Sequence, residues 1–253
     1  MDLPRDLLAE TTLDAAFAGN RLLASLSADD RAMLEPEMEI AEFAGGDTVL
    51  AFGEVTRRSL FPFNGMMVSL RRELTGGRSV EVAAIGREGA VGGIISCGEA
   101  PAFTQAVVQL PGSAALIPMP VLEKAKAASP HIRNLFCRYS DALLAQVMQS
   151  VACNAFHPIE ARAARWLLHA RDRAASDRLE LTQESLAGLL GVQRTTVNAV
   201  ARVLQEQRLI AYRRGAIQVI DRAGLLRVSC DCYAAVEDHF HAVLGPTGRG
   251  AKG

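Results

Sequence analysis

The chain has 253 residues, of which 49% are hydrophobic and 22% charged, and its formal net charge is −1. These values permit one large or two small packed domains and exclude wholesale disorder. No run of about 18 apolar residues is present, which excludes a membrane span, and the five scattered cysteines do not form a disulfide framework. Because the N-terminus lacks a basic and apolar leader, we expect a protein of the reducing cytoplasm.

The small net charge hides an uneven distribution. Residues 157–222 contain eleven arginines, no lysine and seven acidic residues, so their local net charge is +4 and the rest of the chain carries −5. A basic C-terminal third suggests contact with an anion, although a solvated basic face would give the same count.

The first third of the chain changes from helical to strand-like patterning. Leucines at helical spacing occupy the first 35 residues, and Ser27 before two aspartates is typical of a helix start. Short apolar runs separated by glycines follow up to about Pro120, a pattern that predicts a small antiparallel barrel or sandwich. The strand-like runs are 48–50, 66–70, 79–83, 106–110 and 114–117.

Residues 130–154 form a long helical pattern with one apolar stripe. The stripe either packs on the preceding barrel or pairs with a second copy of the chain. We favour the dimer because both flanking domains are small. The stripe residues are Ile132, Phe136, Tyr139, Leu143, Val147 and Val151.

Residues 181–200 match a helix-turn-helix position by position. Thr182 can cap the first helix, Ala187 is small where two helices cross, and Gly191 supplies the turn, where positive φ is easiest for glycine. A structural helix pair with a glycine turn is the alternative, but it rarely leaves so polar a second helix. The residues predicted to contact bases and phosphates in the major groove are Gln193, Arg194, Thr195, Thr196, Asn198 and Arg202.

Two apolar runs, 209–212 and 216–220, flank the basic tip Arg213-Arg214-Gly215. This pattern is typical of a β-hairpin wing. Arg213 and Arg214 can neutralise DNA phosphates, which adds affinity without sequence preference.

The whole arrangement resembles the Crp/Fnr superfamily of bacterial transcription regulators, on motifs at 43–47, 52–54, 61–70, 76–82 and 86–89 together with the helix-turn-helix. The resemblance implies an α+β fold: an N-terminal antiparallel β-roll (jelly-roll-like), a long connecting dimerisation helix and a C-terminal winged helix-turn-helix. It also implies a homodimer on a palindromic DNA operator with half-sites roughly 34 Å apart. The expected division is a helical segment 1–20, a β-roll sensor domain 21–128, a dimerisation helix 129–156, a DNA-binding domain 157–244 and a flexible tail 245–253.

The effector site implied by the resemblance departs from members that bind cyclic AMP. Their glutamate for the ribose falls at Gly93, beside Gly92, and their arginine for the phosphate falls at Gln105. A phosphate needs a cation or a nest of amides, and Gln105 is neutral. We therefore do not expect the protein to bind cyclic AMP. The expected pocket residues are Gly92, Gly93 and Gln105, and the pocket binds either another small-molecule effector or no ligand.

The cysteines and histidines give no cofactor assignment. No cysteine precedes Cys97 and the β-roll contains no histidine, so neither an iron–sulfur cluster nor haem is expected. Cys230 and Cys232 are candidates for redox or metal sensing, but a single Cys-x-Cys lacks two further zinc ligands, and Cys153 is interpreted as a packing residue. We assign no metal site.

The sequence therefore predicts a sequence-specific regulator that binds double-stranded DNA, with Arg194 as guanine reader and Asn198 and Thr195 as its partners. RNA polymerase is a further partner if the protein activates, and no membrane is involved. No catalytic motif is found, so we do not expect an enzyme. The alternative is a protein-interaction module in which the helix-turn-helix is secondary.

Overall fold

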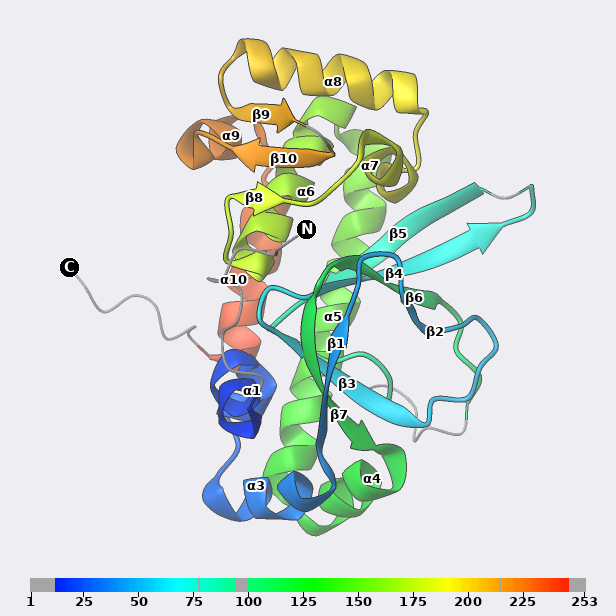
Figure 1. Ribbon diagram of the computed structural model, residues 1–253, viewed down its shortest axis with the longest axis vertical. Coiled ribbons are helices and arrows are strands. Elements are labelled where there is room, and N and C mark those ends of the chain that lie inside the picture. The colour runs from blue at the N-terminus through cyan, green and yellow to red at the C-terminus, as the bar shows by residue number, and fades with distance from the viewer. Residues whose placement is uncertain (1–11, 77, 94–99, 214, 246–253) are drawn as a thin grey trace, which may run out of the picture.

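A computed structural model describes residues 12–76, 78–93, 100–213 and 215–245 (Figure 1). An antiparallel β-roll, a long helix and a C-terminal helix-turn-helix with a hairpin follow one another, which confirms the expected α+β fold. Most of the 1–20 segment and nearly all of the 245–253 tail lie outside the described residues. The proposed division into domains stays a prediction.

Short helices close one end of the β-roll: α1 (Leu13–Gly19), α2 (Arg21–Ala24) and α3 (Ala28–Leu34), followed by a 3-10 turn (Glu35–Glu37). Ser27 caps α3 through a capping box, because its hydroxyl accepts from the Asp30 amide and the Asp30 carboxylate accepts from the Ser27 amide. The predicted helix start is therefore confirmed.

Among the described residues, the β-roll consists of a three-stranded sheet of order β1-β7-β3 and a four-stranded sheet of order β2-β6-β4-β5, both antiparallel. The five predicted runs correspond to β2 and to β4–β7. The sequence analysis did not single out β1 or β3. β3 contains Pro62 and lies at the edge of its sheet, the position where a strand tolerates proline. The strands are β1 (Glu39–Phe43), β2 (Thr48–Leu50), β3 (Arg58–Phe63), β4 (Met67–Leu74), β5 (Arg78–Ile85), β6 (Gln105–Leu110) and β7 (Gly112–Pro118).

After α4 (Met119–Ala128), the long helix α5 (Pro130–Phe156) runs past both sheets to the C-terminal domain (Figure 1). Our interpretation of its apolar stripe as a dimer seam is wrong for every stripe residue except Val151, which is exposed. Ile132, Phe136, Tyr139 and Leu143 are all buried in clusters with β-roll residues of their own chain. The Tyr139 hydroxyl donates to the Ala90 carbonyl oxygen at 3.2 Å. These residues are apolar because they pack against the β-roll.

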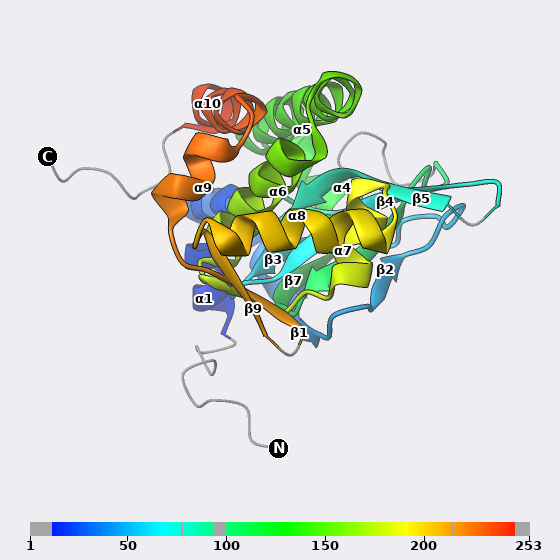
Figure 2. The ribbon, with the colours of Figure 1, turned by 90° about the horizontal axis from the view of Figure 1, so that it is seen from above.

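The C-terminal part begins with α6 (Ile159–Ala174) and β8 (Arg178–Leu179) and ends with α9 (Arg222–Val228) and α10 (Cys232–Leu244). Between them lie α7 (Gln183–Leu190), α8 (Arg194–Glu206) and the β9–β10 hairpin (Ile210–Arg213 and Ala216–Val219). α10 returns antiparallel along α5, so Val236 contacts the middle of α5 and His239 lies 3.6 Å from Asp141 (Figures 1 and 2). In the described part of the chain, no helix is long and apolar enough to cross a membrane.

Candidate nucleic-acid interface

The turn between α7 and α8 has the geometry that the sequence predicts. The Thr182 hydroxyl accepts from the Ser185 amide at 3.0 Å and so caps α7. Gly191 ends α7 in the left-handed region at φ +67°, and the following amide of Val192 donates back to the Ala187 carbonyl oxygen at 3.0 Å. The backbone therefore reverses at Gly191 without strain.

A shared apolar core sets the angle between the two helices. Leu186 and Leu190 of α7 pack with Val197, Val200 and Leu204 of α8, and all five are buried. Ala187 is also buried, which confirms its small-residue position at the helix contact. The core occupies one face of α8 and leaves the opposite face to solvent.

That opposite face carries the residues predicted to contact DNA. Gln193, Arg194, Thr195, Asn198 and Arg202 are exposed, and Thr196 is half-buried. α8 forms the outer edge of the molecule, at the end farthest from the N-terminal helices (Figure 1), and Figure 2 looks down on it. The polar face is therefore open to a large partner.

Arg194 and Arg202 each form an ion pair on this face, and both pairs must break before the two arginines can contact DNA. Arg202 Nε lies 2.8 Å from Glu206 Oε1, and Arg194 Nε lies 4.0 Å from Glu184 Oε2. Exposed pairs of this kind are worth about 0–1 kcal/mol each. Their rearrangement is therefore a small penalty.

The predicted wing is also present. β9 and β10 pair antiparallel, with Ala216 opposite Arg213, and Gly215 adopts φ +79° in the tip. Arg213 is exposed, and the hairpin lies beside α8 in Figure 2. Arg214, the second predicted phosphate contact, lies outside the described residues.

The helix-turn-helix is packed directly against the β-roll. A Cβ on Gly191 would lie 3.2 Å from the Val80 side chain of β5. One helix earlier, Trp166 Nε1 donates to Glu81 Oε1 at 2.8 Å. Burial raises the pKa of the Glu81 carboxyl, because desolvation disfavours its charged form. Strand β5 of the β-roll therefore contacts both α6 and the end of α7.

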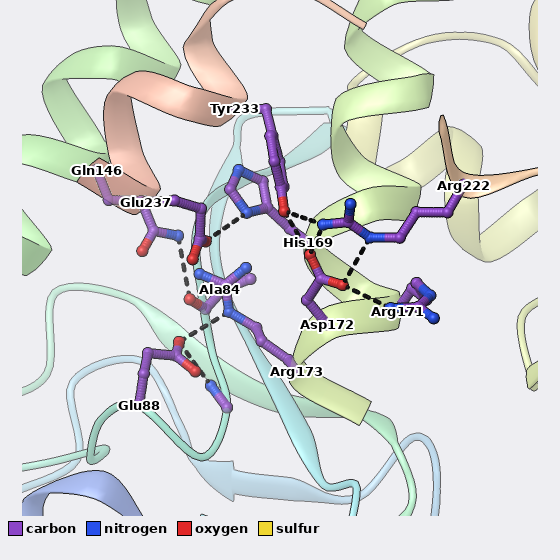
Figure 3. Close-up of polar contacts among 11 residues, drawn as sticks. Ala84, Glu88, Gln146, His169, Arg171, Asp172, Arg173, Arg222, Tyr233 and Glu237 are labelled. Atoms are coloured by element: carbon purple, nitrogen blue, oxygen red, sulfur yellow. Dashed lines mark hydrogen bonds and ion pairs between the residues drawn. The ribbon is translucent and has the colours of Figure 1, made fainter. Parts of the chain in front are cut away.

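A polar network, drawn in Figure 3, joins α6 to the β-roll and to α10. Arg173 Nε lies 2.7 Å from Glu88 Oε1, and His169 Nδ1 lies 3.2 Å from Glu237 Oε1. Asp172 accepts from Arg222 at 3.0 Å and from the Tyr233 hydroxyl. The sequence analysis missed this network because its members are separated by up to 85 residues and belong to no motif.

Acid should lower the free energy of unfolding through His169. Burial lowers the pKa of His169 from 6.5 to about 4, with Arg173 and Arg165 lowering it further and Glu237 opposing them. The unfolded chain therefore binds more protons between these pH values, so stability falls as pH decreases from 6.5 to 4. This residue should account for roughly 3 kcal/mol of that loss. Urea unfolding at both pH values should show a smaller decrease for His169→Gln than for the wild type or for His239→Gln. An equal decrease in all three proteins would contradict the assignment.

Gly92 and Gly93, the two glycines of the expected effector pocket, are packed closely against other side chains of the protein. A Cβ on Gly93 would lie 2.5 Å from Met119 Cε, and one on Gly92 would lie 2.6 Å from Thr56 Cγ2. The Gly93 carbonyl oxygen accepts from Lys126 Nζ at 2.7 Å. Residues 94–99, which follow directly, lie outside the described part of the chain.

Gln105 has a cationic neighbour that its own segment does not contain. Its Nε2 donates to Thr48 Oγ1 at 3.4 Å, and Arg71 lies opposite it on β4. The Arg71 guanidinium donates to Gln109. A cavity of about 360 Å³ lies elsewhere, where the β-roll meets α6 and α10, and its lining includes Arg21, Arg173 and Glu237.

Comparison with known proteins matches both parts of the chain. A family model described as a Crp-like helix-turn-helix domain matches residues 161–228. The HTH-type transcriptional regulator Cmr of Mycobacterium tuberculosis (strain CDC 1551 / Oshkosh) is 37% identical over 68 residues, and this match covers 27% of each protein. The chain thus spans about a quarter of the length of that curated relative.

Solved structures extend the likeness to the β-roll. FixK2 from Bradyrhizobium japonicum is 17% identical with a TM-score of 0.65, over 76% of this chain and 98% of FixK2. A Crp/Fnr-family transcriptional regulator from Thermus thermophilus is 22% identical with a TM-score of 0.62, over 76% of this chain and 98% of that regulator. At these identities the likeness establishes the fold. Together with the helix-turn-helix match, it confirms the resemblance to the Crp/Fnr superfamily.

Proposed function

We propose that this chain, a Crp/Fnr-type transcription regulator with a helix-turn-helix DNA-binding domain, binds a palindromic operator as a homodimer and reads it with α8. The observation that carries the proposal is the exposed polar face of α8 at the outer edge of the molecule. A helix of this kind fits the major groove of double-stranded DNA, where each base pair presents a distinct set of donors and acceptors.

The chemistry of that face suggests how bases are read. Arg194 is the guanine reader, because a guanidinium donates two hydrogen bonds to guanine O6 and N7. Asn198, one turn farther along α8, and Thr195 are its partners in base recognition. Gln193, Thr196, Arg202 and the wing residues Arg213 and Arg214 contact phosphates or flanking bases.

A second face of α5 supports the homodimer. Leu144, Met148 and Val151 are 50%, 58% and 67% exposed although they are large and apolar. With Cys137 and Ala155, also exposed, they form an α5 seam. From Leu144 to Ala155 its residues follow the alternating spacing of four and three that is typical of a coiled coil, and Cys137 precedes Leu144 by one heptad. The β-roll covers one side of α5 and α10 another, and neither covers these seam residues, which leaves them available to a second α5.

The β-roll is proposed to modulate DNA binding through a small molecule other than cyclic AMP. Gly93, beside Met119, supplies no ribose-binding carboxylate. Gln105 supplies no charge for a phosphate, and the Arg71 guanidinium on the neighbouring strand donates to Gln109. Contacts of β5 with Gly191 and Trp166 provide a path from such a ligand to the helix-turn-helix. If the protein activates transcription, RNA polymerase is a further partner.

Selection from random DNA duplexes with the purified protein tests the proposal. We expect enrichment of a palindrome without added ligand, or after addition of cell extract if an effector is required. Failure under both conditions would favour the protein-interaction module, in which the helix-turn-helix is secondary.

Salt dependence of DNA binding tests the role of the wing. Each phosphate contact releases counterions, so affinity should fall steeply with salt concentration. Arg213→Ala should weaken binding to specific and random duplexes alike and reduce the slope of log affinity against log salt by about 1. Arg57→Ala, an exposed arginine of the β-roll, is the matched control and should leave the slope unchanged. A wild-type slope for Arg213→Ala would remove the wing from the interface.

A further inference from the structure

Four potential metal ligands meet where the end of α5 contacts the junction of α9 and α10. They are Cys153 from the last turn of α5, its C-cap residue His157, Cys230 from the junction and Cys232 from the start of α10. Their ligand atoms all lie within 4.8 Å of one another. The sequence analysis left Cys230 and Cys232 without two further ligands and took Cys153 as a packing residue; the fold supplies both missing ligands.

The spacing of these atoms suits a tetrahedral ion. Cys153 Sγ lies 3.5 Å from Cys230 Sγ, and Cys232 Sγ lies 3.3 Å from His157 Nδ1. Zinc bonds of about 2.3 Å to sulfur and about 2.0 Å to nitrogen place neighbouring ligand atoms roughly 3.4–3.8 Å apart. The four side chains therefore need little movement to surround one ion.

Rigid elements hold the ligands in this arrangement. Cys153 and His157 are four residues apart, so they lie on the same face at the end of α5. Cys230 and Cys232 flank Asp231, the N-cap residue of α10. All three cysteine side chains are buried, so water has little access to compete for the ion.

Surrounding groups match the needs of metal-bound thiolates and imidazole. His157 Nε2 lies 3.5 Å from Asp231 Oδ1, so a carboxylate orients the ring and favours the tautomer that leaves Nδ1 free. Gln149 Nε2 donates to Cys232 Sγ at 3.0 Å. Arg162 and Arg165 lie close enough to act on Cys153 electrostatically, and each has a buried Nε without a hydrogen-bond partner among the described residues.

The charge balance also points to a cation. Three thiolates and one divalent ion carry a net charge of −1, which the two arginines offset. A divalent ion favours the thiolate form of a bound cysteine, because its charge stabilises the negative sulfur directly.

We propose that Cys153, His157, Cys230 and Cys232 bind one thiophilic divalent ion per chain, with zinc the ion best suited to a Cys3His set. All four coordination positions are filled by protein, as in structural zinc sites, which leaves no open position for catalysis. The ion links the end of α5 to the start of α10. This link lies beside His157 and Pro158, where the chain turns from α5 into α6. The ion therefore holds the C-terminal DNA-binding domain in a fixed position relative to α5.

The test uses the full, untagged chain purified under reducing conditions without chelator. Elemental analysis should find one zinc ion per chain. Cys153→Ser and Cys230→Ser should each lose it, while Cys137→Ser, an exposed cysteine of the same helix, should retain it. Chelation should lower the Tm of the wild type and leave the Tm of Cys230→Ser unchanged, because only the wild type has metal to lose.

Cobalt substitution supplies a readout that does not depend on the stability of the variants. Co²⁺ bound by the wild type should show the ligand-field bands of a tetrahedral ion and a thiolate-to-cobalt charge-transfer band. A folded wild type that binds neither zinc nor Co²⁺ would overturn the proposal. Zinc retained by both cysteine variants, or a Cys153–Cys230 disulfide in place of metal, would overturn it equally. DNA selection is a separate measurement, so neither result decides the other.

Discussion

We expect Leu144→Asp to convert the proposed dimer to monomers and to abolish tight binding to the operator. Burying one leucine side chain contributes roughly 1.5–3 kcal/mol to the free energy of association. In a symmetric dimer the substitution removes this contribution from both copies. The aspartate would also place an unpaired charge in an apolar seam. The dissociation constant of the dimer should therefore rise at least about 100-fold. Light scattering and sedimentation at several concentrations measure this shift directly.

Two comparisons make the dimer test specific. Met33→Asp changes an exposed apolar residue on α3 and should leave the dimer intact. Leu143→Asp is not a useful test, because Leu143 is buried against its own β-roll and its replacement would unfold the protomer. A dimer that persists in Leu144→Asp would remove the α5 seam from the interface.

Arg194→Ala will weaken binding to the selected operator by about 1–3 kcal/mol, or roughly 5- to 150-fold, and relax the preference at one base pair of each half-site. The reason is the loss of a two-hydrogen-bond contact to a base edge, which phosphate contacts do not replace. Arg194 is exposed and its partner Glu184 is 4.0 Å away, so the folded protein should tolerate the change.

Selection from random duplexes, repeated with Arg194→Ala, measures the base preference. Binding curves on the selected and on random DNA separate lost specificity from lost affinity. Arg213→Ala is the matched comparison, because a phosphate contact should weaken both DNAs equally. If Arg194→Ala keeps the wild-type preference at every position, this residue is not a base reader.

The helix-turn-helix could be predicted from the sequence because its determinants are local. Thr182, Ala187 and Gly191 lie within ten residues of one another, and each meets a requirement of backbone geometry or close packing at its own position. The wing and most β-roll strands were predictable for the same reason, since alternation and turn residues act over a few residues. β1 and β3 were not singled out, and β3 contains a proline that an edge position accommodates.

The role of α5 depended on what packs against it. A helical stripe shows that a face is apolar but not which partner covers it. The stripe from Ile132 to Leu143 contacts the β-roll, and the exposed seam at Leu144, Met148 and Val151 lies on a neighbouring face. Periodicity in the sequence cannot separate these two faces, and our predicted stripe therefore included Val151 together with the residues that contact the β-roll.

By itself the sequence determined the α+β class, the helix-turn-helix and the polar residues that lie on the exposed face of α8. The tertiary structure decided the packing of α5, the network around His169, and the meeting of Cys153 with Cys230, which are 77 residues apart. The physical reason is the range of the interactions. Caps, turns and amphipathic faces are set by neighbours along the chain, whereas ion pairs and ligand clusters exist only after distant segments have packed together.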